Sequence, residues 1–217
     1  MTRLPRPWSP PPWSPMLCCL MLLLTATLPV MAAASASAAP APHAAAAHSA
    51  QNCHTAPSGD AFYVPPKPLP RGPHGDILWC RPSVSPATGA TAWQVLYLST
   101  TVSGTRTAVS GTVLVPTAAY PGTRPVVAYA SGTQGWGDQC AASKEMAAGN
   151  FDEQFAVNNL LSKGWAVVVT DYPGLGTPGD EAYNGGIPEG YAVLDSLRAA
   201  TLLPGSRFAG LPAPSNC

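Results

Sequence analysis

The first clear signal in the hydrophobic pattern of the chain is a pair of β-rich runs. Trp93 to Thr101 (WQVLYLSTT) and Thr107 to Val115 (TAVSGTVLV) are rich in β-branched and aromatic side chains, a composition typical of strands. The linking segment VSGTR contains the glycine that a tight turn needs. The two runs therefore predict an antiparallel hairpin, and a short strand is expected before it at Ile77–Trp79.

Beyond the hairpin, short apolar runs alternate with segments of helical period. Pro125 to Ala130 and Trp165 to Thr170 are apolar throughout or nearly so, as strands of a parallel sheet with two covered faces are. Asn150 to Lys163 and Pro188 to Leu203 have the spacing of amphipathic helices. The buried faces are expected to carry Phe155, Val157 and Leu161 in the first helix and Val193, Leu197 and Ala200 in the second, with Tyr191, Asp195 and Arg198 on the opposite side of the second.

The predicted element order is hairpin, strand, helix, strand, helix. The last four elements form a βαβα unit, which implies parallel strands covered by helices. The fold class is therefore α/β. The folds that open with an antiparallel hairpin and continue in this way include the α/β-hydrolases, so we expect part of that fold.

The N-terminal segment has the layout of a secretory signal peptide. Arg3 and Arg6 precede an apolar run over residues 16–31, and small residues follow to Ala38. The alternative is a membrane anchor, but the run is shorter than the roughly 20 residues that a span needs, and Pro29 interrupts it. We therefore expect a secreted protein with no stable membrane anchor.

The expected domain organisation follows from these boundaries. Residues 1–38 are the predicted signal peptide, 39–58 a low-complexity linker, and 59–217 the hydrolase-like part. The mature N-terminus is expected between Ala36 and Gln51. Prolines are frequent over residues 56–75, so this stretch is predicted to be an extended arm without helix.

Charge and histidine content exclude several partners. Without Arg3 and Arg6, nine basic residues face eleven acidic ones, and no basic run occurs, which argues against nucleic acid. His43 and His48 lie in the linker without neighbouring cysteines or carboxylates, so they are weak metal ligands. We expect no cofactor and no metal.

Four cysteines remain after the predicted cleavage: Cys53, Cys80, Cys140 and Cys217. An even number in an exported chain indicates disulfides, although four cysteines allow three connectivities. The most local pairing, Cys53 with Cys80, would attach the N-terminal arm and is the one that we predict. Cys140 is expected to form no stable disulfide within this chain.

A glycine-rich loop is the main candidate for chemistry. Residues 131–140 (SGTQGWGDQC) follow the first parallel strand, where open α/β sheets bind ligands. Backbone N–H groups in such a loop can stabilise an oxyanion. The alternative is a tight connection without function.

Asp171, directly after the second parallel strand, is a possible catalytic carboxylate. No histidine or serine partner can be assigned to it. We therefore favour a structural role, in which it hydrogen-bonds nearby backbone.

Three runs together resemble the lipase-A-type secretory lipases: VVAYASGTQGWGDQCAAS, GWAVVVTDYPGLGTPG and PEGYAVLDSLRAA. The resemblance implies a secreted α/β-hydrolase that cleaves lipid esters with a Ser-Asp-His triad, so a lipid or ester is the implied partner. It also implies that Thr133, Gln134 and Gly135 belong to the oxyanion-hole region. Cys140 would match a family cysteine that is bridged to a later segment.

The chain departs from that family at the nucleophile. No G-x-S-x-G elbow occurs in the sequence, and the residues from Gly205 to Cys217 do not have a strand pattern. All four histidines precede the hairpin, so none stands in the place of a triad histidine. We expect a truncated lipase or ester-hydrolase homologue that is inactive as this chain.

Two alternatives to that expectation remain. One is a secreted binding or decoy module on a partial hydrolase fold, although a half sheet leaves an exposed edge. The other keeps the fold and changes the chemistry to that of a peptidase, acyltransferase or polyester depolymerase.

Overall fold

The structure, a computed structural model, describes Cys53 and residues 56–208. The predicted signal peptide, the cleavage window and most of the linker lie outside these residues. The β-branched runs form one five-stranded sheet in the order β1-β2-β3-β5-β4. The strands are β1 (Ile77–Ser83), β2 (Ala90–Thr100), β3 (Arg106–Pro116), β4 (Val126–Tyr129) and β5 (Ala166–Thr170).

The predicted hairpin is confirmed. β2 and β3 pair antiparallel without interruption from Ala90 opposite Pro116 to Thr100 opposite Arg106. Gly104 turns the chain between them with a φ of 76°, a value that glycine adopts without steric cost. β1 extends beyond the expected Trp79 to Ser83, because these residues continue to pair with β2.

The predicted parallel pair is confirmed as well. β4 and β5 run parallel, from Val126 opposite Ala166 to Tyr129 opposite Val169, and β5 joins the hairpin by pairing antiparallel with β3. Every residue of β5 is buried, as its continuous apolar composition predicted. The carboxyl ends of β4 and β5 therefore lie at the same edge of the sheet.

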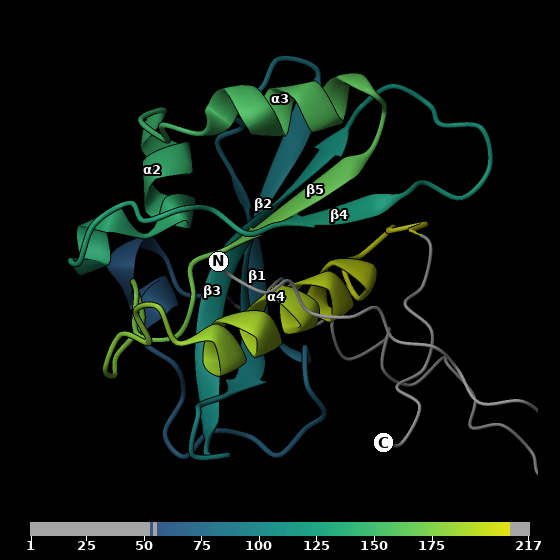
Figure 1. Ribbon diagram of the computed structural model, residues 1–217. Helices are drawn as coiled ribbons and strands as arrows, with labels where there is room; N and C mark the ends of the chain where they lie inside the picture. Colours follow the sequence, from purple (N-terminus) through teal and green to yellow (C-terminus); the bar gives the residue numbers. More distant parts are fainter. Residues whose placement is uncertain (1–52, 54–55, 209–217) are drawn as a thin grey trace, which may run out of the picture. The chain divides into compact units, whose positions relative to one another are not determined.

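Helices cover both faces of the sheet (Figure 1). Both predicted helices form, as α3 (Gln154–Ser162) and α4 (Gly186–Thr201). Val168 of β5 packs in the core on the α4 side, whereas Val167 and Val169 pack with α2 and α3 on the other. Three elements were not predicted: η1 (Gly59–Tyr63), η2 (Asp138–Cys140) and α2 (Ala142–Ala148).

The predicted buried face of α3 is wrong at one position. Val157 and Leu161 are buried, but Phe155 is 77% exposed. Successive helical residues are about 100° apart, so Phe155 lies nearly opposite Val157 and cannot share its face.

The buried face of α4 also differs from the prediction, which placed Asp195 opposite the apolar side. Asp195 is fully buried, together with the small residues Ala192, Ser196 and Ala199. Its carboxylate is 2.9 Å from His74 Nδ1 and 2.5 Å from Arg198 Nη1. A buried charge is tolerated when it is paired in this way, and this tertiary pairing has no signature in the local pattern.

The prediction that the N-terminal arm contains no helix is wrong for one turn. The 3-10 helix η1 fits between Pro57 and Pro65 and contains no proline. It buries Phe62 and Tyr63. Arg81 donates to the carbonyl oxygens of Pro57 and Gly59 at 3.0 Å, which attaches the arm to β1.

The predicted disulfide between Cys53 and Cys80 is present. Cys140 has no disulfide partner in the described part of the chain, and Cys217 lies outside it. None of the helices in residues 56–208 is long and apolar enough to cross a membrane.

Candidate functional site

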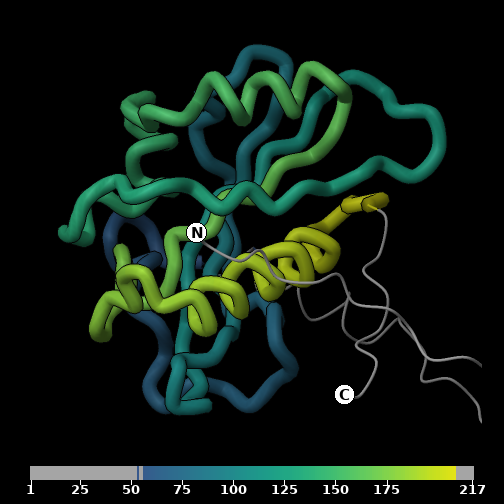
Figure 2. Tube along the Cα trace, viewed as in Figure 1, coloured from purple at the N-terminus to yellow at the C-terminus, as the bar shows by residue number. Residues whose placement is uncertain are grey.

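The candidate site lies where β4 and β5 end. The loop after β4 and the loop after β5 occupy the same end of the sheet (Figure 2). Asp138 Oδ1 joins them by accepting a hydrogen bond of 3.1 Å from the Gly176 N–H. A cavity of about 140 Å³ lies between the two loops.

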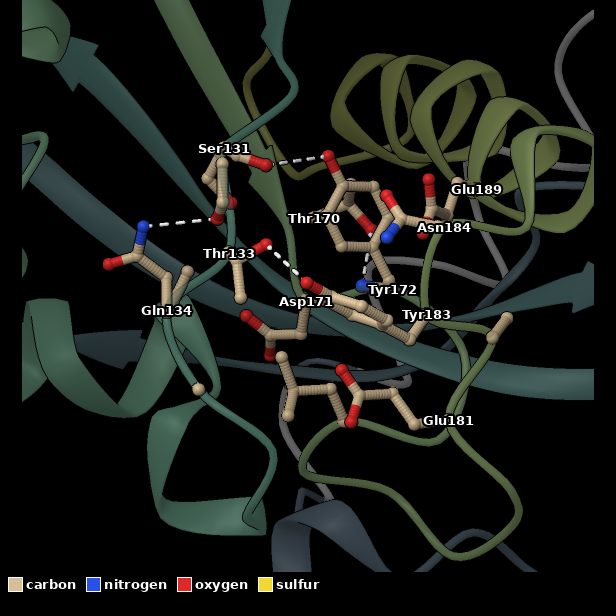
Figure 3. A pocket seen from close by; sticks show the side chains of 15 residues that line it. Ser131, Thr133, Gln134, Thr170, Asp171, Tyr172, Glu181, Tyr183, Asn184 and Glu189 are labelled. Carbon is tan, nitrogen blue, oxygen red and sulfur yellow. Dashed lines mark hydrogen bonds between the residues drawn. The ribbon is translucent and has the colours of Figure 1, made fainter.

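Thr133, Gln134 and Gly135, which the sequence placed in the oxyanion-hole region, all line this cavity. Figure 3 shows Thr133 beside Tyr183, whose hydroxyl lies 3.5 Å from Thr133 Oγ1. The side-chain amide of Gln134 is directed to Glu153 Oε1, at 2.9 Å. The same amide nitrogen also donates to the Gly132 carbonyl oxygen at 3.1 Å, so the Gln134 side chain is engaged by the protein.

Glycine is required at position 135. Its φ is 133°, and a Cβ there would lie 2.5 Å from Cys140 Sγ. A side chain would have to displace Cys140 as well as adopt a backbone conformation that L-residues avoid.

The hydrogen bonds of the loop show which backbone donors remain available. The Gly132 N–H donates to Glu153 Oε1 at 2.8 Å. For residues 133–135, no acceptor among the described residues contacts the backbone N–H groups. Three consecutive residues that line the cavity thus have backbone donors without a protein partner in the described part of the chain, and free backbone donors beside a cavity are what an oxyanion needs.

Asp171 lies beneath the cavity and is 1% exposed. Its carboxylate accepts hydrogen bonds from Ser110 Oγ (2.6 Å), Ser143 Oγ (2.5 Å) and the Ser143 N–H (2.7 Å). Burial raises the pKa of Asp171, and these three hydrogen bonds oppose the rise. None of the donors is a histidine, but Ser110 and Ser143 are serine partners that the sequence analysis could not assign, and both lie far from Asp171 in the sequence. The geometry is that of a structural carboxylate, held by distant side chains and not by nearby backbone as expected.

Asp171 also ends a buried relay that sequence reasoning missed. Gln94 Nε2 donates to the Tyr63 hydroxyl at 2.9 Å, and that hydroxyl lies 3.0 Å from Ser143 Oγ. Since Ser143 Oγ donates to Asp171, the Tyr63 hydroxyl is the donor to Ser143. The relay connects the N-terminal arm to the site, and no local sequence pattern marks its members.

Tyr172 is the most strained residue of the site. Its φ of 67° lies in the left-handed region, which costs a non-glycine residue about 1–3 kcal/mol. The conformation lets its hydroxyl donate to the Ser131 carbonyl oxygen at 3.0 Å, across the two loops. Burial, with the charges of Glu189 and Glu153, raises the pKa of Tyr172 to about 12, so the hydroxyl keeps its proton.

The charged side chains that line the cavity are all acidic: Asp171, Glu181 and Glu189. At its rim, Trp136 is 72% exposed and stacks on Tyr183 with ring centroids 4.6 Å apart. Within the described residues, no three His, Cys, Asp or Glu side chains are grouped as metal ligands. The lining favours an uncharged ligand with apolar parts.

His74 is the described histidine with a carboxylate partner, Asp195, and its Nε2 lies 3.3 Å from Thr100 Oγ1. It does not line the cavity between the loops. It joins the arm to α4 and β2, a role that the sequence analysis did not predict.

These features together define a partial α/β-hydrolase fold: an antiparallel hairpin, a parallel pair, helices on both faces and a cavity at the carboxyl edge. Candida antarctica lipase A in its closed state has the same fold over 70% of this chain and 36% of that one, with a TM-score of 0.53 and 22% identity. The cell-wall-degrading esterase LipA of Xanthomonas oryzae, as its N228W mutant, matches 59% of this chain and 38% of its own, with a TM-score of 0.51 and 24% identity.

Sequence comparison finds similarity to one family over part of the chain. The profile of the family described as Secretory lipase matches residues 144–212. A secreted triacylglycerol lipase of Malassezia globosa is 34% identical over 155 residues, which cover 64% of this chain and 32% of that protein. A probable inactive lipase of Mycobacterium tuberculosis is 32% identical over 66% of this chain and 34% of its own length.

The chain is similar to the secretory lipases: their family model matches residues 144–212, and two lipase relatives are 34% and 32% identical to it over 64% and 66% of its length. It spans about a third of the length of the curated relatives that it matches.

Proposed function

We propose that this chain is part of a secreted carboxylic-ester hydrolase and supplies the oxyanion side of its active site. The observation that carries the proposal is the set of three consecutive N–H groups at Thr133, Gln134 and Gly135, which line the cavity without an acceptor in the described part of the chain. In ester hydrolysis, negative charge develops on the carbonyl oxygen. Oriented donors stabilise that charge, and the loss of one costs about 10²–10³ in kcat.

The nucleophile would come from a strand-to-helix elbow with the pattern G-x-S-x-G, which these 217 residues do not contain. The sheet offers a place for such a strand. β4 is at the edge, and Phe208 forms a parallel bridge with Arg124, just before β4 begins. A strand that continued this pairing would run parallel to β4 and end beside the loop that follows Tyr129.

The substrate that fits the lining is an uncharged ester with apolar parts. Asp171, Glu181 and Glu189 leave the cavity without a basic residue, so an anionic acyl or alcohol group would be repelled. The exposed Trp136–Tyr183 pair at the rim offers an apolar contact with a polar edge, as aromatic residues do at lipid–water boundaries. A lipid ester combines these properties.

We propose an extracellular location, with residues 1–38 removed as a signal peptide and 39–58 acting as a linker to the domain at 59–217. A relative described as secreted and a family described as Secretory lipase support this. N-terminal sequencing of protein recovered from the medium should begin between residues 36 and 51. A sequence that begins at residue 1 would contradict the proposal.

A second function is a secreted binding module without catalysis. The relative described as a probable inactive lipase favours it, as does the commitment of Asp171 to scaffold hydrogen bonds. Such a module would have to be a soluble monomer that unfolds cooperatively despite the open edge at β4.

The two functions are separated by an activity experiment on two proteins: the 217-residue chain and the product of the longest reading frame that continues past the codon for Cys217. Each is assayed with p-nitrophenyl esters and with a fluorophosphonate probe that labels activated serines. The 217-residue chain should show neither hydrolysis nor labelling, because it has no elbow serine. The longer product should show both, and a Gly135→Pro change that distorts the loop should abolish hydrolysis.

Two results would contradict the hydrolase proposal. One is the absence of any elbow-encoding sequence downstream in any frame. The other is turnover of order 1 s⁻¹, typical of enzymes, by the 217-residue chain, which would reveal an unrecognised nucleophile.

A further inference from the structure

We propose that Glu153 is a positioning residue, which holds the glycine-rich loop so that the N–H groups of Thr133, Gln134 and Gly135 remain available to a ligand. The inference rests on the proposed function, because it concerns the same loop. It assigns the geometry of the loop to a carboxylate from a different element, at the start of α3.

The carboxylate of Glu153 makes three hydrogen bonds with the strand and loop. Oε1 accepts from the Gly132 N–H at 2.8 Å and from Gln134 Nε2 at 2.9 Å. Oε2 accepts from the Tyr129 hydroxyl at 2.5 Å. Glu153 thus contacts the last residue of β4 and two residues of the loop, and among the described residues it is the only side chain outside the loop that hydrogen-bonds Gly132 or Gln134.

These contacts determine which donors are free. Glu153 accepts hydrogen bonds from the Gly132 N–H and from the Gln134 side chain. The backbone N–H groups of the next three residues are left without an acceptor in the described part of the chain. A Cβ at position 132 would lie 3.0 Å from Glu153 Oε1, so glycine permits the close approach of the carboxylate.

The backbone of Glu153 is held in place by a helix that is packed against the sheet. It is the N-cap residue of α3, and that helix is held to the sheet by the buried side chains of Val157 and Leu161. The far end of the loop is held separately, by the hydrogen bond from the Gly176 N–H to Asp138 Oδ1. Since the two ends are attached to different elements, loss of Glu153 should free the first half of the loop and leave the second half in place.

Glu153 does not line the cavity, so it acts through the loop and not on a ligand. The negative charge of the Glu153 carboxylate is stabilised by its three hydrogen-bond donors: the Gly132 N–H, Gln134 Nε2 and the Tyr129 hydroxyl. The hydrogen bond with Glu153 is the first cause that raises the pKa of Tyr129 to about 12, which keeps the tyrosine proton available to donate.

The test is amide hydrogen exchange, followed by ¹⁵N NMR, on the full 217-residue chain and four variants. Glu153→Ala removes the acceptor, and Glu153→Asp keeps the charge but is one methylene too short. Glu153→Gln keeps the length, since its Oε1 can accept from Gly132 and its Nε2 can donate to the Tyr129 oxygen. Asp152→Ala removes a neighbouring charge from an exposed side chain and is the matched control.

We expect the Gly132 amide to exchange at least about tenfold faster in Glu153→Ala and Glu153→Asp, which corresponds to about 1.4 kcal/mol of local protection. Glu153→Gln should restore exchange to within about threefold of wild type, and Asp152→Ala should not change it. The Gly132 amide proton resonance should move upfield in Glu153→Ala, because its acceptor is lost. The amides of β5 serve as the internal reference for global stability.

The proposal is overturned if Gly132 exchanges at the wild-type rate in Glu153→Ala, or if Asp152→Ala accelerates it equally. It is also overturned if the β5 amides accelerate by the same factor as Gly132, because Glu153 would then stabilise the whole domain. If Glu153→Ala does not fold, Glu153→Asp against Glu153→Gln decides the question. No ester is used, so failure of ester hydrolysis in the longer product leaves this result intact.

Discussion

Replacement of Asp171 by alanine should destabilise the protein more than any other single change in the site. The carboxylate is 1% exposed and accepts three hydrogen bonds from Ser110 and Ser143. Alanine would leave those donors buried without an acceptor, at about 1–3 kcal/mol each. Removal of the buried charge also removes its desolvation penalty, which offsets part of this loss of stability. We therefore expect a loss of about 3–5 kcal/mol in the free energy of unfolding, the range observed when one member of a buried polar pair is removed.

Asparagine at the same position should cost less, about 1–2 kcal/mol, because its oxygen still accepts one or two of the bonds. The comparison also isolates the effect of charge. Burial raises the pKa of Asp171 above its ordinary value of 3.8, so the native state binds this proton more tightly than the unfolded chain. The stability of wild type should then fall as the pH rises from about 3.8 through the native pKa. Asp171→Asn should lack this component.

The assay is urea unfolding followed by tryptophan fluorescence, at pH 7 and at a series of lower pH values. Asp152→Ala is the control, since an exposed carboxylate should change stability by no more than about 0.5 kcal/mol. An Asp171→Ala protein within about 1 kcal/mol of wild type, with an unchanged m-value, would refute the reasoning. So would a wild-type stability that rises relative to Asp171→Asn over the same pH interval.

Three further predictions test the scaffold around the site. Conversion of Cys53 and Cys80 to serine opens a loop with a sequence separation of 27 residues and should cost about 3–4 kcal/mol, measured by urea unfolding; insensitivity of wild-type unfolding to dithiothreitol would contradict it. Tyr97→Phe removes a buried hydroxyl that bonds Thr170 Oγ1 at 2.6 Å and the Ala192 carbonyl oxygen at 3.0 Å, and should lower stability by about 1–2 kcal/mol in the same measurement. Gly75→Ala places a Cβ 2.3 Å from Arg198 Cβ at a φ of 81°, whereas Gly89→Ala places its Cβ in open space at a φ of 75°. The first variant should lose at least about 2 kcal/mol of stability and the second about 1 kcal/mol. Equal melting temperatures for the two variants would show that the contact with α4 is unimportant.

The sheet could be predicted from the sequence because its information is local. Residues 93–101 and 107–115 alternate or cluster β-formers on either side of a glycine turn, and Trp165–Thr170 is apolar throughout. Each run by itself indicates a strand, and the rules for how strands and helices are connected then allow few topologies. α2 was missed because the seven residues Ala142–Ala148 are too few for a helical period to be recognised.

The faces of the helices could be predicted only in part. Asp195 is buried because His74 and Arg198 pair with it, and His74 is more than a hundred residues away in the sequence. The apolar residues Tyr191 and Leu194 are exposed on the same helix. A prediction from an amphipathic pattern places charged residues on the solvent side of the helix. A buried ion pair makes that assignment wrong.

The position of the candidate site could be predicted, but not the means by which it is held. Placement of residues 131–140 after a parallel strand was enough to locate the loop at the ligand-binding edge. Glu153, Asp171 and Ser143 come from three different segments, and their contacts depend on how α2 and α3 pack against the sheet. No spacing in the sequence records such distances.

The construction of the loop bears on the choice between a hydrolase and a binding module. The loop is held by the Glu153 carboxylate at one end and by the hydrogen bond of Asp138 with Gly176 at the other, and its Gly135 has no room for a side chain. Tyr172 adopts an unfavourable backbone conformation, in which its hydroxyl donates to the Ser131 carbonyl oxygen. Strain of this kind persists where the surrounding structure requires it, often at functional sites. A binding surface could use many loop conformations, whereas oxyanion stabilisation requires donors fixed before the charge develops. The fixed geometry of the loop therefore favours the proposed ester hydrolase over the binding module, with the nucleophile expected on a strand beside β4.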